Sequence, residues 1–275
     1  MRRLKILLIA LFVFVFVIYT TSSIYQHIVK QNTAPVITCE TETLEVSVSA
    51  DDLSLLQGVS AMDAEDGDLT NRILIGGISN LLSNNTAEIT YLVFDNDNNM
   101  GTCTRYLHYI DYEGPKFVLK QPLIFTLDQK VSLTGRLQAT DMIDGDISES
   151  IRISTLDLPP ASAGVYTITV QVTNSMGDTV HLSLPIILNT TDSFRPVIQL
   201  KEYLIYMDVG SPFNPRDYLE NVSAPVSDVD DPSELLSAVA IENNVDPNTP
   251  GTYQVTYTYS GVFSTGMSIL TVVVE

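Results

Sequence analysis

The chain has 275 residues, of which 45% are hydrophobic and 17% charged, so it carries enough apolar side chains for packed cores, and wholesale disorder is excluded. The formal net charge is −19, and Arg2, Arg3 and Lys5 precede everything else, which leaves 11 Lys and Arg against all 33 acids. So acidic a chain repels nucleic acid and anionic lipid headgroups, and a nucleic-acid partner is excluded.

Residues 1–30 are the first predicted element, an export signal. A short basic segment precedes an unbroken apolar run from Ile6 to Tyr19, and Thr and Ser continue it to Ile24 and Tyr25. About twenty such residues span a bilayer, and the basic flank keeps the amino terminus in the cytoplasm. We therefore interpret residues 1–30 as an uncleaved, single-pass signal anchor with an extracellular C-terminal region. Thr21 and Ser23 also suit a signal peptidase, so secretion after cleavage is the alternative.

Three similar segments follow the apolar run. Each opens on a proline and an apolar stretch, and Pro35, Pro115 and Pro196 are spaced by 80 and 81 residues. Proline is tolerated at the first residue of a strand, so each proline marks a strand start. The spacing predicts three modules, over residues 34–112, 115–189 and 196–275, a size that small all-β domains reach.

An acidic turn comes next in each segment. The first turn recurs 78 residues later, and the third segment keeps only part of it. The matched residues are Asp63, Asp66, Gly67 and Asp68 in the first segment, Asp141, Asp144, Gly145 and Asp146 in the second, and Asp228 and Asp231 in the third. Asp and Gly adopt turn conformations readily, and Asp side chains bond the backbone two residues on.

Strands with strict alternation follow the turns. The apolar or aromatic face holds Tyr91 and Val93 in the first segment, Tyr166, Ile168, Val170 and Val172 in the second, and Tyr253, Val255, Tyr257 and Tyr259 in the third. A period of two indicates a half-buried β-strand. Apart from residues 1–30 and one turn at "PSELLSA", no helical period competes. The predicted fold class is all-β, with three tandem β-sandwich modules after an N-terminal transmembrane helix.

The order of these motifs, with "ATDMIDGDI" and "DPNTPGTY", resembles the bacterial Ig-like modules repeated in Gram-positive surface proteins, a family with a relative in an insecticidal crystal toxin. The resemblance covers residues 34–275 and implies Ig-like sandwiches that serve as spacers, adhesion stalks or binding domains. It also implies that Tyr166 and Tyr253 form tyrosine corners, whose hydroxyls bond nearby backbone. The first segment lacks the Pro-Gly-Thr-Tyr corner, and the third lacks the Asp-Gly-Asp turn.

Cys39 and Cys103 are the only cysteines in the chain. Both lie beyond the apolar run, where oxidation is permitted, so the sequence predicts one disulfide. Two free thiols that fill core space are the alternative. The family resemblance places Cys39 on the first strand and Cys103 on the last strand of the module, side by side.

The same resemblance places the acidic turn and the last hairpin at the end of the module that faces the preceding linker. The acids gathered there in the second segment are Asp141, Asp144, Asp146 and Asp178, together with Asp111 and Glu113 of the linker; the first segment has Asp63, Asp66, Asp68, Asp95 and Asp97. Calcium prefers clustered carboxylate and carbonyl oxygens, so calcium-braced linkers are one hypothesis. The other hypothesis is turn chemistry alone, which needs no metal.

No motif for a catalytic reaction is present. The histidines His27, His108 and His181 are scattered, and no nucleophile elbow, phosphate loop or zinc motif occurs, so we predict no enzyme activity and no required cofactor. The predicted function is a membrane-anchored stalk and binding or adhesion module with a protein or polysaccharide ligand. Tyr203, Tyr206 and Tyr218 are candidate recognition residues. The alternative is an assembly component of a cell-envelope complex with no ligand at its tip.

Overall fold

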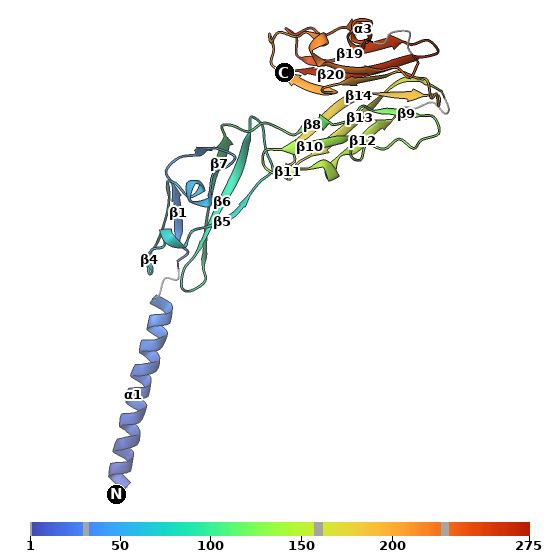
Figure 1. Cartoon of the computed structure of the whole chain (residues 1–275). Coiled ribbons are helices and arrows are strands. Elements are labelled where there is room, and N and C mark those ends of the chain that lie inside the picture. Colours follow the sequence, from blue (N-terminus) through green and yellow to red (C-terminus); the bar gives the residue numbers. More distant parts are fainter. Residues whose placement is uncertain (1, 30–32, 157–161, 227–230) are drawn as a thin grey trace. The chain divides into compact units, whose positions relative to one another are not determined.

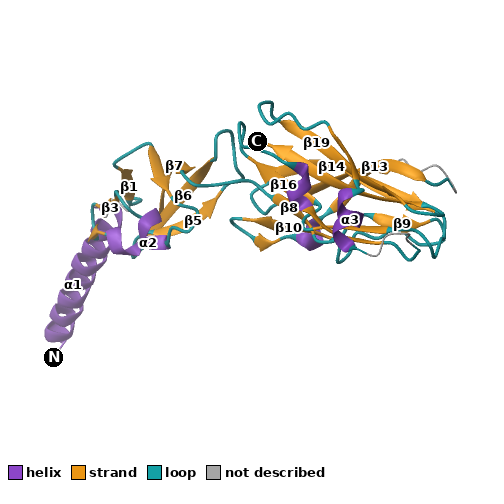
Figure 2. Ribbon diagram, turned by 45° about the horizontal axis from the view of Figure 1, so that its top comes forward, coloured by secondary structure: helices purple, strands orange, loops and turns teal. Residues whose placement is uncertain are grey.

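The computed structural model describes residues 2–29, 33–156, 162–226 and 231–275. They form two compact units, Met1–Ile110 and Asp111–Glu275, called unit 1 and unit 2 below and described separately (Figure 1). Strands make up nearly all regular structure outside the N-terminal helix, as Figure 2 shows. The prediction of an all-β chain after one apolar helix is confirmed.

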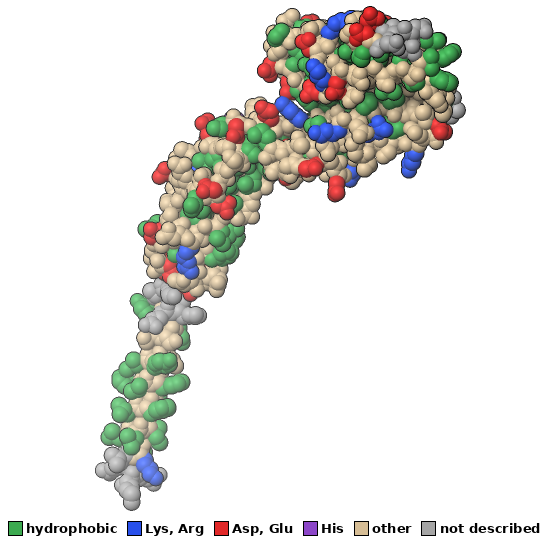
Figure 3. Space-filling view, in the orientation of Figure 1, with side chains coloured by type: hydrophobic (Ala, Val, Ile, Leu, Met, Phe, Trp, Pro, Cys, Tyr) green, Lys and Arg blue, Asp and Glu red, His purple; other side chains and the backbone are tan. Residues whose placement is uncertain are grey.

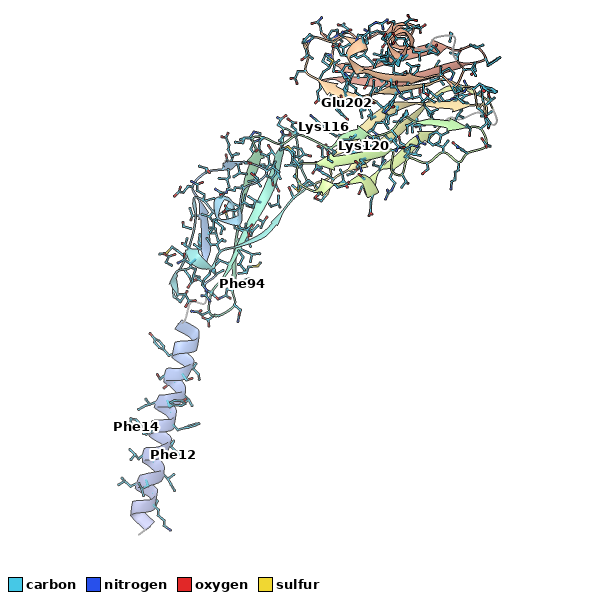
Figure 4. All side chains as sticks on the ribbon, viewed as in Figure 1. Phe12, Phe14, Phe94, Lys116, Lys120 and Glu202 are labelled. Atoms are coloured by element: carbon cyan, nitrogen blue, oxygen red, sulfur yellow. The ribbon has the colours of Figure 1, made fainter. Side chains whose placement is uncertain are left out.

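The N-terminal helix is α1, Arg2–Val29. Its apolar side chains are exposed around the helix, and Phe12 and Phe14 both extend away from the ribbon in Figure 4. The stretch Lys5–Tyr25 has 21 residues and is long and apolar enough to cross a membrane. By length and composition, α1 suits a membrane anchor and a signal sequence equally well.

The rest of unit 1 consists of two sheets with the strand orders β1-β3-β4 and β2-β7-β6-β5. The strands are β1 Val36–Cys39, β2 Thr43–Val46, β3 Val59–Asp63, β4 Gly67–Asp68, β5 Leu74–Ile78, β6 Thr86–Phe94 and β7 Met100–Tyr109. Two short helices, α2 (Asp52–Leu55) and the 3₁₀ helix η1 (Thr70–Arg72), connect them. Ile89, Tyr91 and Val93 of β6 are fully buried, because alternate side chains of this strand face the core.

Unit 2 contains the same pairing pattern twice, as β8-β10-β11 with β12-β13-β14-β9, and as β15-β17 with β16-β20-β19-β18. Its strands are β8 Lys116–Leu119, β9 Ile124–Thr126, β10 Leu137–Asp141, β11 Gly145–Asp146, β12 Arg152–Leu156, β13 Gly164–Thr173, β14 Thr179–Asn189, β15 Val197–Leu200, β16 Leu204–Met207, β17 Leu219–Ser223, β18 Ala240–Asn243, β19 Gly251–Ser260 and β20 Thr265–Val274. Its helices are η2 Ser148–Ser150, η3 Pro215–Tyr218 and α3 Pro232–Ser237. Thus α3 forms the helical turn expected at "PSELLSA".

The alternating faces predicted for unit 2 are confirmed. Ile168, Val170 and Val172 of β13 are fully buried, as are Val255 and Tyr257 of β19. The residues between them remain partly or fully exposed, so each strand has one core face and one outer face.

One continuous hydrophobic core fills unit 2, and it joins residues of the second predicted segment to residues of the third. The backbone N–H of Phe117 in β8 donates to the hydroxyl of Tyr206 in β16 over 3.0 Å. The amine of Lys116 pairs with the carboxylate of Glu275 at 2.8 Å and lies 5.5 Å from the ring centroid of Tyr206. Removing residues 196–275 is therefore expected to expose core that belongs to the remaining half.

Candidate functional site

The acidic turns are built by one aspartate that accepts two backbone N–H groups. Asp63 Oδ1 accepts from Glu65 and Asp66 at 2.9 and 2.8 Å, and Asp141 Oδ1 accepts from Ile143 and Asp144 at 2.9 and 3.0 Å. The glycines that follow have φ near +77° and +72°, a conformation that glycine adopts without a steric cost. The side chain of Asp231 in the third segment caps α3 instead, and Asp228 lies outside the described residues.

The second aspartate of each turn holds the neighbouring hairpin. Asp66 accepts from the backbone and side-chain nitrogens of Asn96, both at 2.7 Å. Asp144 accepts from the backbone N–H and the hydroxyl of Ser175 at 2.6 and 2.7 Å. These bonds to the charged form of a carboxylate fix two loops against each other.

The third aspartate of each turn bonds the start of a 3₁₀ helix. The hydroxyl and backbone N–H of Thr70 hold the pKa of Asp68 below its usual value, and Ser148 does the same for Asp146. The turns are thus held by hydrogen bonds within the protein, which supports the turn-chemistry hypothesis.

Tyr112 joins the remaining acids of the second segment. Its hydroxyl donates to Asp178 Oδ2 at 2.8 Å and accepts from the Asn174 amide at 2.8 Å; the same amide donates to Asp141 at 3.2 Å. Burial raises the pKa of Tyr112 far above its usual value, and the hydrogen bond to Asp178 raises it further. The phenol therefore stays protonated and remains a donor to the carboxylates.

The predicted calcium ligands do not converge on a metal position in this structure. Within residues 33–156, 162–226 and 231–275, no three acid, histidine or cysteine side chains form a group that suits a metal ion. Glu113 instead pairs with Lys116 at 2.8 Å. Donors of the protein bond both carboxylate oxygens of Asp141 and Asp144, and Oδ1 of Asp146.

Calcium is therefore expected to leave these turns unchanged. Calorimetric titration of the full chain in detergent micelles with calcium should give no saturable heat. The Asp144→Asn variant should give the same result. Magnesium at the same concentration is the control for ionic strength. Saturable binding of calcium that Asp144→Asn abolishes would contradict this expectation and restore the metal hypothesis.

The two tyrosine corners implied by the family resemblance are confirmed. The hydroxyl of Tyr166 donates to the carbonyl of Ser162 at 3.1 Å, and the hydroxyl of Tyr253 donates to the carbonyl of Thr249 at 2.9 Å. Each tyrosine ring lies over the glycine two residues before it, where an added Cβ would approach ring atoms to 3.1–3.5 Å. A small residue at Gly164 and Gly251 thus leaves room for the ring.

The disulfide predicted between Cys39 and Cys103 is not formed in this structure. The two strands do lie side by side, and the Sγ atoms are 2.7 Å apart, but both cysteines are free. Burial raises the pKa of Cys39 to about 11, and the hydrogen bond with Cys103 contributes to that increase. The structure therefore agrees with the alternative prediction of two free thiols, and the predicted disulfide is wrong.

The raised pKa predicts slow thiol chemistry at Cys39. At neutral pH almost no thiolate is present, and the alkylation rate should rise about tenfold per pH unit toward pH 11. Replacing Cys103 with alanine removes the hydrogen bond, so the Cys39 rate profile should shift to lower pH. Iodoacetamide labelling followed by mass spectrometry measures both, with urea-unfolded protein as the reference. If the alkylation rate of Cys39 in the folded protein depended on pH as in the unfolded protein, the raised pKa of Cys39 would be contradicted.

The three candidate recognition tyrosines lie in or against the core of unit 2. Tyr203 is buried in the core of unit 2, and Tyr206 and Tyr218 pack against that core. The hydroxyl of Tyr206 is engaged by Phe117, and the ring of Tyr218 lies 5.7 Å from that of Phe213. Core packing accounts for Tyr206 and Tyr218, because aromatic rings bury a large apolar area, whereas Tyr203 also lines a groove of unit 2.

Unit 2 carries a groove that the sequence did not indicate. Its volume is about 520 Å³. It is lined by the β8–β9 loop, the start of β9, the end of β14, the whole of β15 with the residues on either side of it, and single residues of β17 and β20. All seven consecutive residues from Arg195 to Lys201 contribute. Because successive side chains of a strand point to opposite faces, this pattern means that the groove runs along the edge of β15. In the described sheet, β15 pairs with β17 alone, which leaves that edge open.

The groove combines apolar contacts with polar groups. Pro122, Ile124, Pro196 and Met267 supply the apolar part of its wall, and Gln121, Gln199 and Asn189 supply amide side chains. Glu220 is its single acid. An apolar concave surface with a few polar groups is the usual character of a ligand site.

Three of the chain's 14 Lys and Arg line this groove: Lys120, Arg195 and Lys201. Figure 4 labels Lys120 on unit 2, with Lys116 and Glu202 in the same region, and Figure 3 shows Lys and Arg side chains mixed with Asp and Glu there. Among the described residues, none of the three forms an ion pair within 4.0 Å, since the pairs found belong to Lys116. We call this set of lining residues the basic groove.

The side chain of Arg195 is held in place. One terminal nitrogen donates to the carbonyl of Thr265 at 2.8 Å, and the other donates to the hydroxyl of Thr190 at 3.4 Å. Its Nε is buried and has no acceptor among the described residues. Lys201 donates to the carbonyl of Asp217 at 2.6 Å, so part of its donor capacity remains free. Sequence patterns missed this group of cations because Lys120 precedes Arg195 by 75 residues and Lys201 by 81 residues.

Comparison with known proteins finds relatives whose sequences align with only part of this chain. No protein-family model matches the chain. It is 31% identical over 122 residues to an uncharacterized 81.3 kDa protein of Acholeplasma phage L2, and 28% identical over 143 residues to the pesticidal crystal protein Cry22Aa of Bacillus thuringiensis. These alignments cover 43% and 52% of this chain, but only 16% and 19% of the relatives. The similarity to a crystal protein agrees with the sequence resemblance, and membership of the Gram-positive repeat family stays a prediction.

Solved structures resemble the chain only distantly. The CBM51-2 and INT domains of Clostridium perfringens ZmpB, in complex with GlcNAc, match at 18% identity and a TM-score of 0.23, over 54% of this chain and 26% of that one. Mouse Cadherin-23 EC22-24 matches at 15% identity and a TM-score of 0.21, over 89% of this chain and 99% of that one. TM-scores this low support no inference about the ligand or the activity of this chain.

Proposed function

We propose that this protein is a membrane-anchored, extracellular Ig-like repeat protein that binds a ligand at the basic groove of unit 2. In this proposal, α1 is an uncleaved signal anchor, and the three segments 34–112, 115–189 and 196–275 are tandem sandwich modules. The ligand is a protein or a polysaccharide of the cell surface, and the protein carries out no reaction. The observation that carries the proposal is the open, cation-lined groove along β15.

Three further features support a binding role. The apolar side chains of α1 are exposed along the span Lys5–Tyr25, as a helix in contact with lipid requires. The acidic turns and tyrosine corners hold loops rigidly, which is what a stalk needs. The common core of unit 2 fixes the two sides of the groove relative to each other, so the site is preformed.

Filling the groove tests the proposal without disturbing the core. The full chain in detergent micelles is mixed with cell-envelope material of the producing organism and sedimented. Gln199→Trp places a large ring in the groove and should reduce co-sedimentation strongly, whereas Asn248→Trp, at an exposed position outside the groove, should not. Equal binding by all three proteins would overturn the groove as the site.

Cross-linking in intact cells tests the anchoring and the assembly alternative. Partners that attach mainly at residues 111–275 support the binding proposal, and partners confined to residues 1–110 support an envelope-assembly role instead. Fractionation of the same cells distinguishes an anchored chain, which stays with the membrane, from a secreted chain that has lost α1.

A further inference from the structure

We infer that the ligand of the basic groove is an anionic polysaccharide, that is, a hydroxyl-rich polymer that carries phosphate, sulfate or carboxylate groups. This inference rests on the proposed function and specifies its ligand class. Its starting point is charge. In a chain with 33 acids and 14 Lys and Arg, three cations line one groove and none of them is ion-paired among the described residues.

The chain as a whole is acidic, so a group of neighbouring cations that faces few acids is a local exception to its charge. Lys120, Arg195 and Lys201 carry like charges around one cavity, and Glu220 is the only acid among the lining residues. Asp192, which is not a lining residue, also interacts electrostatically with Arg195. Lys116 shows the contrasting case, because Glu113 and Glu275 both pair with it at 2.8 Å. The net charge of −19 repels polyanions at long range, so attraction for an anionic ligand is confined to short range at the groove, where three cations face one lining acid.

The donors in the groove suit oxyanions. Arg195 is oriented by Thr265 and Thr190, so its guanidinium is fixed before a ligand arrives. The backbone N–H of Lys120 donates to the carbonyl of Arg136 at 2.7 Å, and its amine has no hydrogen bond with the described residues, which leaves the ammonium group available to a ligand. These two cations together accommodate successive charges along a polymer.

The remaining lining groups suit hydroxyls and sugar rings. Gln121, Gln199 and Asn189 both donate and accept hydrogen bonds, and Glu220 accepts from hydroxyl groups. Pro122, Pro196 and Met267 offer apolar surface against which the C–H face of a sugar ring packs. A simple inorganic anion would use the cations and leave these groups without a role.

An acidic peptide fits less well. A peptide that bound along the edge of β15 would add a strand, and it would need backbone N–H groups of that edge. The N–H of Leu200 is already donated to the hydroxyl of Tyr203, at 3.4 Å. Tyr203 thus occupies one end of the edge, and the polysaccharide is the occupant that the groove favours.

The test uses two polymers with the same backbone, dextran sulfate and neutral dextran, and the full chain in detergent micelles. Dextran sulfate should bind, and its affinity should fall as salt rises. Lys120→Gln and Lys201→Gln should each weaken binding about two- to fivefold, and the double variant correspondingly more. The matched control is Lys130→Gln, which removes the same charge from an exposed lysine outside the groove and should bind like the unmodified protein.

Other outcomes overturn the inference in distinguishable ways. Equal affinity for both dextrans, blocked by Gln199→Trp, would leave the groove as a binding site and reject the anionic class. Groove-dependent binding of poly-L-glutamate without binding of dextran sulfate would indicate an acidic protein instead. Dextran sulfate binding that is unaffected by the double variant would place the anion elsewhere. If envelope binding is also insensitive to Gln199→Trp, the proposed function fails together with the inference.

Discussion

Replacing Arg105 with alanine is expected to destabilise unit 1 by about 2–4 kcal/mol. Arg105 is only 4% exposed, although it carries a charge. Its Nε donates to the hydroxyl of Tyr91 at 2.9 Å, and one terminal nitrogen donates to the carbonyls of Leu55 and Gln57 at 3.0 and 2.8 Å. Leu55 is the last residue of α2, so the guanidinium satisfies carbonyls at a helix end.

The loss arises from both polarity and packing. Without Arg105, the carbonyl of Gln57 loses its donor inside the protein, and the fully buried Tyr91 loses a neighbour that lies 5.2 Å from its ring centroid. An unsatisfied buried carbonyl and a new cavity each destabilise the fold. Arg105→Met keeps the apolar stem, so its cost should be smaller than that of alanine.

Thiol labelling measures this effect in unit 1 specifically, because the only two cysteines lie there. The full chain in detergent micelles is exposed to increasing urea, and labelling of Cys39 and Cys103 reports unfolding of unit 1. Arg72→Ala is the control, since the Arg72 side chain is exposed, donates to Asn96 and otherwise interacts only electrostatically with Asp95; its effect should stay within about 0.5 kcal/mol. Equal midpoints for the two alanine variants would show that Arg105 has no special structural role.

Replacing Gly101 with alanine is expected to cost unit 1 about 2–3 kcal/mol. A Cβ built on Gly101 would lie 2.1 Å from the carbonyl oxygen of Pro35 and 2.9 Å from its carbonyl carbon. Both are backbone atoms, so no side-chain rotation relieves the clash. The chain just before β1 must move away from β7, and Cys39 and Cys103 should label at lower urea.

Gly77→Ala is the matched control for this substitution. Gly77 also lies in a strand of unit 1, and an added Cβ would meet no atom within 4 Å. Its effect should be close to zero or slightly stabilising, because alanine restricts the unfolded chain. The same close approach occurs in unit 2, where a Cβ on Gly266 would lie 2.3 Å from the carbonyl oxygen of Pro196. If Cys39 and Cys103 are labelled at the same urea concentration in the Gly101→Ala and Gly77→Ala variants, the close approach of Gly101 to Pro35 does not govern the stability of unit 1.

Local sequence patterns predicted the secondary structure well. The proline rule placed the starts of β1, β8 and β15 correctly, since β1 begins at Val36, β8 at Lys116 and β15 at Val197. Alternation identified the core faces of β6, β13 and β19, because a period of two is a property of the strand itself. The acidic turns and tyrosine corners were also predicted, and each depends on bonds that span only a few residues.

Long-range pairing was not predictable in the same way. In three places a short strand pairs in parallel with a distant one, as β2 does with β7, β9 with β14, and β16 with β20. The burial of Arg105 depends on carbonyls 48 and 50 residues away. A short sequence window contains no signal for such contacts, and an arginine on a strand normally indicates an exposed position.

The sequence by itself determined that this protein has an apolar N-terminal helix followed by β-strands with alternating faces, because periodicity, turn residues and apolar length act locally. Only the tertiary structure decided that Cys39 and Cys103 are close without a bond, that the acidic turns are held by protein donors, and that a basic groove lies along β15. The groove depends on Lys120 and Lys201 meeting across one shared core. Proximity of that kind results from packing, which residue order alone does not specify.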